Sequence, residues 1–294
     1  MKNKLLTITL AALSIVLAGS CEKSDDITPD NGSEQVLPKD VLSGVFSVSD
    51  TKKVHFSKGN LFYDGSKYCF ENNQYDIPVR KGIETSSHNG HFFWSSKENC
   101  ARELYIYSDP STSGSDVFFA NRPESFEVNG QKGWSVLSGG TGGEWEYLLD
   151  KRKTTYGKGT AIENRRYAAV QVNSVAGLLV FPDEFSWPEG AGDQPQTFNT
   201  NSSSWNDRNY TVSQFGTLQA ADCVFLPAAG LRNGYLGSHE PKKVNGAGIE
   251  GYYWSASPCV IDACDLNFSR GEVDSSDSYD RHHAFSVRLV MDVK

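Results

Sequence analysis

The segment 259–283 is crowded with side chains that can make directed polar contacts. The candidate ligand-binding residues in it are Asp262, Asp265, Asn267, Arg270, Asp274, Asp277, Tyr279, Asp280, His282 and His283. Tyrosine supplies contact area at low entropic cost, and Asp, Asn and Ser supply adaptable hydrogen bonds. We therefore expect this segment to recognise a ligand. A solvated loop without function is the competing interpretation.

Two patterns in the same segment bear on metals and disulfides. Asp265, Asn267 and Ser269 alternate as at the start of a calcium loop, but Ser276 stands where the closing acid belongs, which excludes an EF-hand and leaves a looser calcium site open. Cys259 and Cys264 bracket four residues, as a hairpin disulfide would, and two unpaired thiols are equally compatible with the spacing. No CxxC pair or Cys/His cluster has zinc spacing. We predict no metal and no cofactor.

Signatures of catalysis are missing from the sequence. It contains no Gly-x-Ser-x-Gly elbow, Walker loop, His-Glu-x-x-His helix or Rossmann fingerprint, and its six histidines are scattered. The prediction is a protein that binds rather than catalyses.

The N-terminus predicts export and lipid attachment. Lys2 and Lys4 precede an apolar run from Leu5 to Leu17, and small residues lead into Cys21. This pattern resembles the lipobox of bacterial lipoproteins, which implies that residues 1–20 are a signal peptide and that Cys21 is acylated. The acidic residues 22–26 resemble the surface-export signal of Bacteroidetes lipoproteins. We expect a cell-surface protein, held in the outer membrane by its lipid anchor.

Composition sets the domain plan and excludes one class of partner. Residues 21–40 are polar and rich in helix and strand breakers, so a flexible tether is predicted, whereas 41–294 is long enough for one domain with a sizeable core. The net charge is −8. Loss of residues 1–20 would remove two lysines and no acid, making it −10. Nucleic acid is therefore excluded as a partner.

Local patterns predict many short strands and two helices. Strands are expected at 45–48 and 54–56, which form an opening hairpin, and at 91–94, 167–172, 177–181, 223–226, 252–256, 265–268 and 285–290. One helix is expected after a capping box at Thr141 and Glu144, with Trp145, Leu148 and Leu149 facing the core and Arg152 in solvent. A second box, Thr211 to Gln214, predicts a shorter helix that ends near Asp222.

Four motifs carry a family resemblance over residues 42–294. They are Gly139-Gly140-Thr141-Gly142-Gly143-Glu144-Trp145-Glu146-Tyr147-Leu148, Phe225-Leu226-Pro227-Ala228-Ala229-Gly230, Gly251-Tyr252-Tyr253-Trp254-Ser255-Ala256-Ser257 and Phe285-Ser286-Val287-Arg288-Leu289-Val290. In this order they resemble the Fibrobacter succinogenes major paralogous domain family of gut-bacterial lipoproteins, and also the formylglycine-generating (sulfatase-modifying factor) family. The resemblance implies an α+β, C-type-lectin-like fold. We expect Trp145, Tyr147 and Trp254 to be core residues, and Arg288 to pair with Glu144 or Glu146.

The ligand expected for this scaffold is an extracellular glycan or protein, presented to loops around 205–210, 232–247 and 259–283. The last segment also resembles the variable stretch of retroelement-diversified lectin-like proteins, where mutated adenine codons cannot yield Lys, Glu, Gln, Met or Trp. Within 259–283 only Glu272 belongs to that set. Two alternatives stay open, namely an enzyme with a remodelled sulfatase-modifying-factor site and a structural or adhesive surface component.

Overall fold

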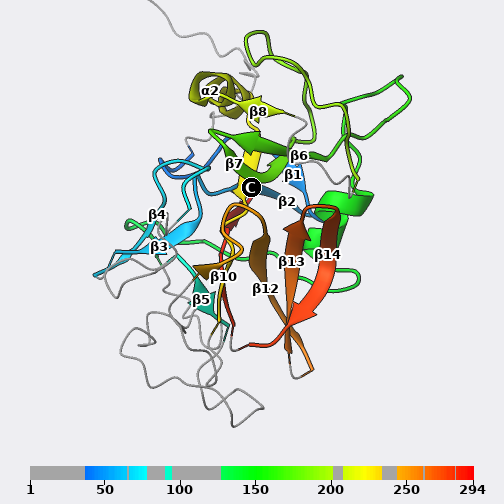
Figure 1. Cartoon of the computed structure of the whole chain (residues 1–294). Helices are drawn as coiled ribbons and strands as arrows, with labels where there is room; N and C mark the ends of the chain where they lie inside the picture. The colour runs from blue at the N-terminus through cyan, green and yellow to red at the C-terminus, as the bar shows by residue number, and fades with distance from the viewer. Residues whose placement is uncertain are drawn as a thin grey trace, which may run out of the picture. The chain divides into compact units, whose positions relative to one another are not determined.

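Short antiparallel strands, grouped into small sheets, make up most of the regular structure in the computed structural model (Figure 1). The structure describes residues 37–64, 66–77, 90–94, 127–200, 208–233, 244–260, 262–281 and 283–294. Cys21, the predicted signal peptide and His282 lie outside these ranges. Leu37–Lys294 form one compact unit. Asp40, expected at the end of the tether, is buried in this unit and paired with Lys58 at 2.6 Å.

The described strands form five sheets. β1 (Phe46–Ser47), β2 (Lys53–Phe56) and β16 (Val290–Asp292) form the first, and β3 (Leu61–Tyr63) pairs with β4 (Tyr68–Phe70). β11 (Val244–Asn245), β10 (Leu231–Asn233), β15 (His283–Phe285) and β5 (Phe92–Phe93) lie in that order in another. β8 (Asn209–Tyr210), β6 (Tyr167–Val172), β7 (Val175–Val180) and β9 (Val224–Pro227) form the fourth, in which only β6 and β8 are parallel. β12 (Gly251–Cys259), β13 (Asp262–Ser269) and β14 (Glu272–Tyr279) form the fifth.

The architecture is therefore α+β and rich in strands, with two short helical segments in the described part of the chain. The opening hairpin is confirmed by the pairing of Phe46 with Val54. Two of the predicted ligand-presenting loops contain strand residues, in β8 and in β10 and β11, and their centres, 205–207 and 234–243, lie outside the described ranges. The third, 259–283, is mostly β13 and β14 and not a loop.

Helix α2 (Val212–Ala220) begins as its sequence predicts. The Thr211 hydroxyl accepts from the backbone N–H of Gln214, and the Gln214 side chain accepts from the backbone N–H of Thr211. These two bonds satisfy N–H groups that have no partner within the helix. Phe215 and Leu218 then pack into the core, and the helix ends just before Asp222.

The first helical segment has a different cap from the predicted one. α1 (Glu144–Glu146) continues as a π-helical turn, η4 (Tyr147–Lys151), and Thr141 makes no capping bond. Instead Ser138 and Glu144 exchange two hydrogen bonds: the Ser138 N–H donates to Glu144 Oε2, and the Glu144 N–H donates to Ser138 Oγ. The chemistry of a capping box is thus present, but its two residues are six apart and not three.

Arg152 is buried, contrary to the expectation that it faces solvent. Its guanidinium pairs with Asp183 at 2.9 Å and donates to the Phe181 carbonyl at 2.6 Å. Asp183 also accepts from the backbone N–H of Ser47. A buried arginine needs such partners to offset its lost hydration, so this pair joins the helical segment to the strands around it.

Arg288 forms a second buried network at the centre of the fold. It contacts neither Glu144 nor Glu146, which pair with Lys52 and Lys151. Its guanidinium donates to Asn60 Oδ1 at 3.3 Å and to Gln74 Oε1 at 2.8 Å. Burial lowers the pKa of Arg288 to about 10.

The same network holds the loops that contain Asn60 and Gln74 against Tyr253 and strand β9. Asn60 Nδ2 donates to the hydroxyl of Tyr253, and that hydroxyl donates to the Pro227 carbonyl at 2.9 Å. Gln74 Oε1 also accepts from the backbone N–H of Phe225 at 2.7 Å. We call Asn60, Gln74, Tyr253 and Arg288 the Arg288 network. Around it lie three apolar clusters, which include the fully buried rings of Trp145 and Trp254.

Candidate functional site

One face of the sheet β12–β13–β14 gathers five of the ten predicted ligand-binding residues. Cross-strand neighbours in an antiparallel sheet share a face. Trp254 pairs with Asp265 and Asp265 with Asp277, while Tyr252 pairs with Asn267 and Asn267 with Asp274. Tyr279 pairs with Ala263, which lies two residues from Asp265. We call the face that carries Tyr252, Asp265, Asn267, Asp274, Asp277 and Tyr279 the aspartate face. Trp254 and Ala263 also lie on this face and are fully buried in the core. The opposite face carries Tyr253, Leu266 and Phe268, which pack in the core as well.

A β-bulge in β14 is what places two aspartates together. Between Asn267 and Asp265 strand β13 has one residue, whereas between their partners Asp274 and Asp277 strand β14 has two, Ser275 and Ser276. Residues three apart on a regular strand point to opposite faces. Because the bulge adds one residue to β14, the carboxylates of Asp274 and Asp277 lie on the same face. The Ser275 hydroxyl donates to Asp150 on the opposite face.

Asp265 is the unusual group of the aspartate face. It is fully buried, and neither carboxyl oxygen has a hydrogen-bond partner among the described residues. Burial raises the pKa of Asp265 well above its ordinary value, and the nearby carboxylates of Asp277 and Asp274 raise it further. The environment therefore favours the protonated, neutral form of this group. A buried, unsatisfied polar group is costly, and such groups concentrate at functional sites.

Asp274 and Asp277 also satisfy the backbone of their own strand. Asp274 Oδ1 accepts from the N–H of Ser276 at 2.9 Å, and Asp277 Oδ1 accepts from the N–H of Ser278 at 2.8 Å. The other oxygen of Asp277 accepts from the Asn267 amide. β14 is the edge strand of its sheet, and carboxylates that bond its N–H groups oppose pairing with another strand. These bonds favour ligand recognition by side chains over addition of a strand.

Aromatic rings border the carboxylates. Tyr279 contacts Tyr252, His283 and Phe285 with ring centroids 5.9, 4.8 and 5.4 Å apart. The Tyr252 hydroxyl donates to Glu250 Oε2 at 3.2 Å. Burial raises the pKa values of both tyrosines and lowers that of His283, so all three are neutral near pH 7. Both tyrosines are partly exposed and offer a ring beside an acid.

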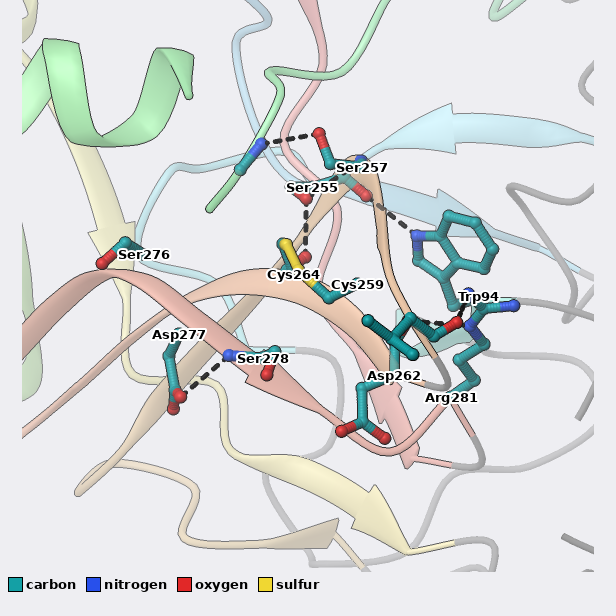
Figure 2. Close-up of a disulfide and its surroundings, with 12 residues drawn as sticks. Trp94, Ser255, Ser257, Cys259, Asp262, Cys264, Ser276, Asp277, Ser278 and Arg281 are labelled. Atoms are coloured by element: carbon teal, nitrogen blue, oxygen red, sulfur yellow. Dashed lines mark hydrogen bonds between the residues drawn. A yellow bond between two sulfur atoms is a disulfide. The ribbon is translucent and has the colours of Figure 1, made fainter. Parts of the chain in front are cut away.

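A disulfide fixes the end of the same sheet. Cys259 and Cys264 are joined, with their Cα atoms 5.5 Å apart, as one of the two sequence interpretations predicts. Figure 2 shows Ser255 and Ser257 on one side of this bond and Asp277 on the other. Ser255 Oγ donates to the Cys264 carbonyl, and Ser257 Oγ accepts from the Gly139 N–H. A Cβ on Gly140 would lie 3.0 Å from the Cys264 sulfur, so the turn before α1 packs closely on the disulfide.

The remaining predicted residues lie at the two ends of the sheet. Arg270 is exposed in the turn between β13 and β14. Asp262 begins β13, and its carbonyl accepts from Arg281, whose guanidinium lies 4.6 Å from the centroid of the Trp94 ring (Figure 2). The Asp280 carbonyl lies 3.4 Å from Nδ1 of His283, which is buried in β15. His282 was predicted as a ligand-binding residue and lies outside the described ranges.

Sequence reasoning missed Tyr252 and Glu250. The signal for Tyr252 was present, since it directly precedes Tyr253 in a strand and must face away from it. The pairing that places it beside Asn267 could not be known without the register.

Among the residues that the structure describes, no group of three or more His, Cys, Asp or Glu side chains has the geometry to hold a metal ion. Within the same ranges, no helix is both long and apolar enough to cross a bilayer.

In comparisons with known proteins, no protein-family model, curated protein or solved structure matches the chain. The function is therefore proposed from the fold and the aspartate face alone.

Proposed function

We propose that this protein is a lipid-anchored, non-catalytic binding module on the bacterial surface, in which a C-type-lectin-like scaffold presents the aspartate face to an extracellular glycan or protein. The observation that carries the proposal is the convergence of Asp265, Asp274 and Asp277 beside two tyrosines. Loops and edges on a rigid frame are common places for recognition. Attachment through Cys21 would keep the module at the membrane while its binding face samples the exterior.

The chemistry of the aspartate face favours a ligand that donates hydrogen bonds or positive charge. The carboxylates of Asp274 and Asp277 offer hydrogen-bond acceptors, and the Asn267 amide already donates to Asp277. Tyr252 and Tyr279 add flat apolar area with a hydroxyl at the edge. A protein with basic side chains or a glycan with several hydroxyls would satisfy both features, whereas an anionic ligand would be repelled by a chain of net charge −8.

We extend the proposal to retroelement diversification of 259–283, but only at its exposed positions. In β14 the exposed positions, such as Ser276 and Ser278, accept any side chain at little cost. Ser275 is buried against Asp150, and Asp265 on the aspartate face is fully buried. Sequence changes in related strains are therefore expected at the exposed positions of β14 and not at these buried ones.

The enzyme alternative requires a thiol that the disulfide removes. A remodelled sulfatase-modifying-factor site would use a reactive cysteine at 259 or 264, and both sulfurs are bonded to each other. Such an enzyme would have to work with this bond opened by a reductant. Alkylation of the native protein at either cysteine without prior reduction would support the enzyme and contradict the binding module.

The test of the proposal is a binding screen with matched variants. Full-length protein in detergent or vesicles is applied to glycan and protein arrays, and each hit is titrated against Asp277→Asn, Tyr279→Ala and the control Asp193→Asn. Asp193 is an exposed acid elsewhere on the surface, paired only at 4.0 Å with Arg208. We expect about tenfold weaker binding or more for the first two variants and no change for the control. Hits that bind all three variants equally, or no hits, would reject the aspartate face.

The lipid anchor is tested separately. Metabolic labelling with a fatty-acid analogue should mark the wild-type protein and leave Cys21→Ser unlabelled. An unlabelled wild-type protein that is released into the medium would show that the N-terminus is an ordinary signal peptide, without affecting the binding test.

A further inference from the structure

A cavity of about 670 Å³ lies beside β3 and β4, in a different sheet from the aspartate face. Phe62 and Cys69 face it as a cross-strand pair, and Lys58, Asp64, Lys67 and Asn72 add polar groups to its lining. A second cavity of about 460 Å³ shares Lys58 and Asn129 with the first. Clefts of roughly 300–1,000 Å³ are the usual size for sites that hold small ligands.

The charges around the larger cavity are of both signs. Two lysines, Lys58 and Lys67, line it together with three acids, Asp64, Glu71 and Asp76. Lys58 is already paired with Asp40 at 2.6 Å, and Asp64 Oδ1 accepts from the hydroxyl and N–H of Ser66. A lining with both signs of charge gives no strong attraction to an anion or a cation. It does offer donors and acceptors side by side, which suits an uncharged ligand with many hydroxyl groups.

Two lining side chains are available to such a ligand. Asn72 and Lys67 are exposed, and neither side chain makes a hydrogen bond or ion pair within the described residues. Asn72 can donate and accept, and Lys67 can donate three bonds. Phe62 is partly exposed on the same cavity and supplies an apolar surface. Sugar rings combine apolar C–H faces with hydroxyl edges, so they match this combination of groups.

We propose that this cavity is a second binding site, for an uncharged oligosaccharide held by Asn72 and Lys67 with one sugar ring packed on Phe62. The site is independent of the aspartate face, because the two share no lining residue and belong to different sheets. Either site can therefore fail its test without affecting the other.

Cys69 gives a direct readout of occupancy. It is a free cysteine, partly exposed, that lines the cavity. Burial raises the pKa of its thiol to about 11, with smaller contributions from Asp64 and Glu71, so alkylation is slow at neutral pH and faster at pH 9. A sugar in the cavity would cover the thiol and slow its alkylation. Cys223, which is fully buried, serves as the unreactive internal control.

The experiment screens neutral oligosaccharides against the full-length protein. Alkylation of Cys69 at pH 9 is followed by mass spectrometry of its peptide, with and without each sugar, and sugars that protect it are titrated by calorimetry. We expect at least one sugar to slow the alkylation of Cys69 about threefold or more. We also expect Asn72→Ala and Phe62→Ala to weaken its binding about tenfold, whereas Gln219→Ala, an exposed change on α2, has no effect.

Three results would overturn the proposal. One is a panel of neutral oligosaccharides in which none protects Cys69. Another is a protecting sugar whose affinity is unchanged in both cavity variants. The third is loss of sugar binding in Asp277→Asn with full binding in Asn72→Ala, which would assign the sugar to the aspartate face. Because Asn72 is exposed, its variant tests the site even if Phe62→Ala fails to fold.

Discussion

The guanidinium of Arg288 donates a hydrogen bond to the side-chain oxygen of Gln74 over 2.8 Å, and both side chains are buried. This bond joins the C-terminal segment to the loop after β4. Gln74 in that loop also accepts from the Phe225 N–H and donates to the Cys223 carbonyl, so it contacts a third segment as well. Gln74 thus connects segments that are about 150–210 residues apart in sequence. Buried amides and arginines therefore hold the core of this protein together along with apolar contacts.

Removing either member of this pair should destabilise the whole domain. Arg288→Ala and Gln74→Ala each leave buried polar groups without partners, and each is expected to lower the free energy of unfolding by about 3 kcal/mol. The double variant should cost about 1–3 kcal/mol less than the sum, since both changes break the same bond. Urea denaturation of the four proteins measures this coupling. Additive effects within about 0.5 kcal/mol would mean that the two residues act separately.

Asp265 should make stability fall as the pH rises. Its pKa is raised in the folded protein, so the native state keeps a proton that the unfolded chain has lost, and stability decreases from the ordinary value of 3.8 upward. Asp265→Asn, which cannot ionise, should raise the melting temperature at pH 7 by about 2–4 °C for each kcal/mol relieved. At pH 3 the variant and the wild type should melt alike. Equal melting temperatures at pH 7 would show that Asp265 is ionised in the native protein without cost.

The disulfide should stabilise the hairpin of β12 and β13. It closes a loop of only five residues in sequence separation, for which the chain-entropy model gives about 2 kcal/mol. We expect Cys259→Ser with Cys264→Ser to lower the melting temperature by several degrees, and a reductant to lower it in the wild type but not in the double variant. Cys69→Ser, which removes a free thiol, is the control and should respond to reductant as the wild type does. A wild type unaffected by reductant would contradict the prediction.

The two candidate caps of α1 give opposite predictions. Ser138→Ala should lower stability by about 1 kcal/mol, because the N–H of Glu144 loses its acceptor. Thr141→Ala should have no effect, because its side chain makes no capping bond. Thr211→Ala, at the cap of α2, is the positive control and should match Ser138→Ala. Thermal unfolding of the three variants distinguishes the sequence interpretation from the observed geometry, and a loss confined to Thr141→Ala would favour the former.

Local sequence predicted those parts of the fold whose partners are close in the chain. The Thr211 cap and the opening hairpin are each specified within about ten residues, and both are confirmed. The cap of α1 was placed on the wrong residue because Ser138 reaches Glu144 only across a turn in which Gly140 has a φ of 78°. Nothing in the spacing of Ser138 and Glu144 indicates such a turn.

Long-range partners explain the other differences. Arg152 was expected in solvent because its partner Asp183 is 31 residues away. β14 was not expected as a strand because its sequence, Glu-Val-Asp-Ser-Ser-Asp-Ser-Tyr, has no apolar alternation. Its register depends on β13 and the turn at Gly271, which only the folded chain brings together. Five of the ten predicted residues, Asp265, Asn267, Asp274, Asp277 and Tyr279, share the aspartate face, and the bulge that aligns them could not be predicted from the sequence.

The bulge has a consequence for how this surface can change. The number of residues between Asp274 and Asp277 decides which face of the sheet each later side chain of β14 occupies. Deleting the single codon for Ser276 would rotate Asp277 and Tyr279 toward α1 and the interior, although every other amino acid is kept. Gains and losses of one residue, more than exchanges of one residue for another, are thus the shortest mutational route by which this lineage could abolish or restore the carboxylate cluster.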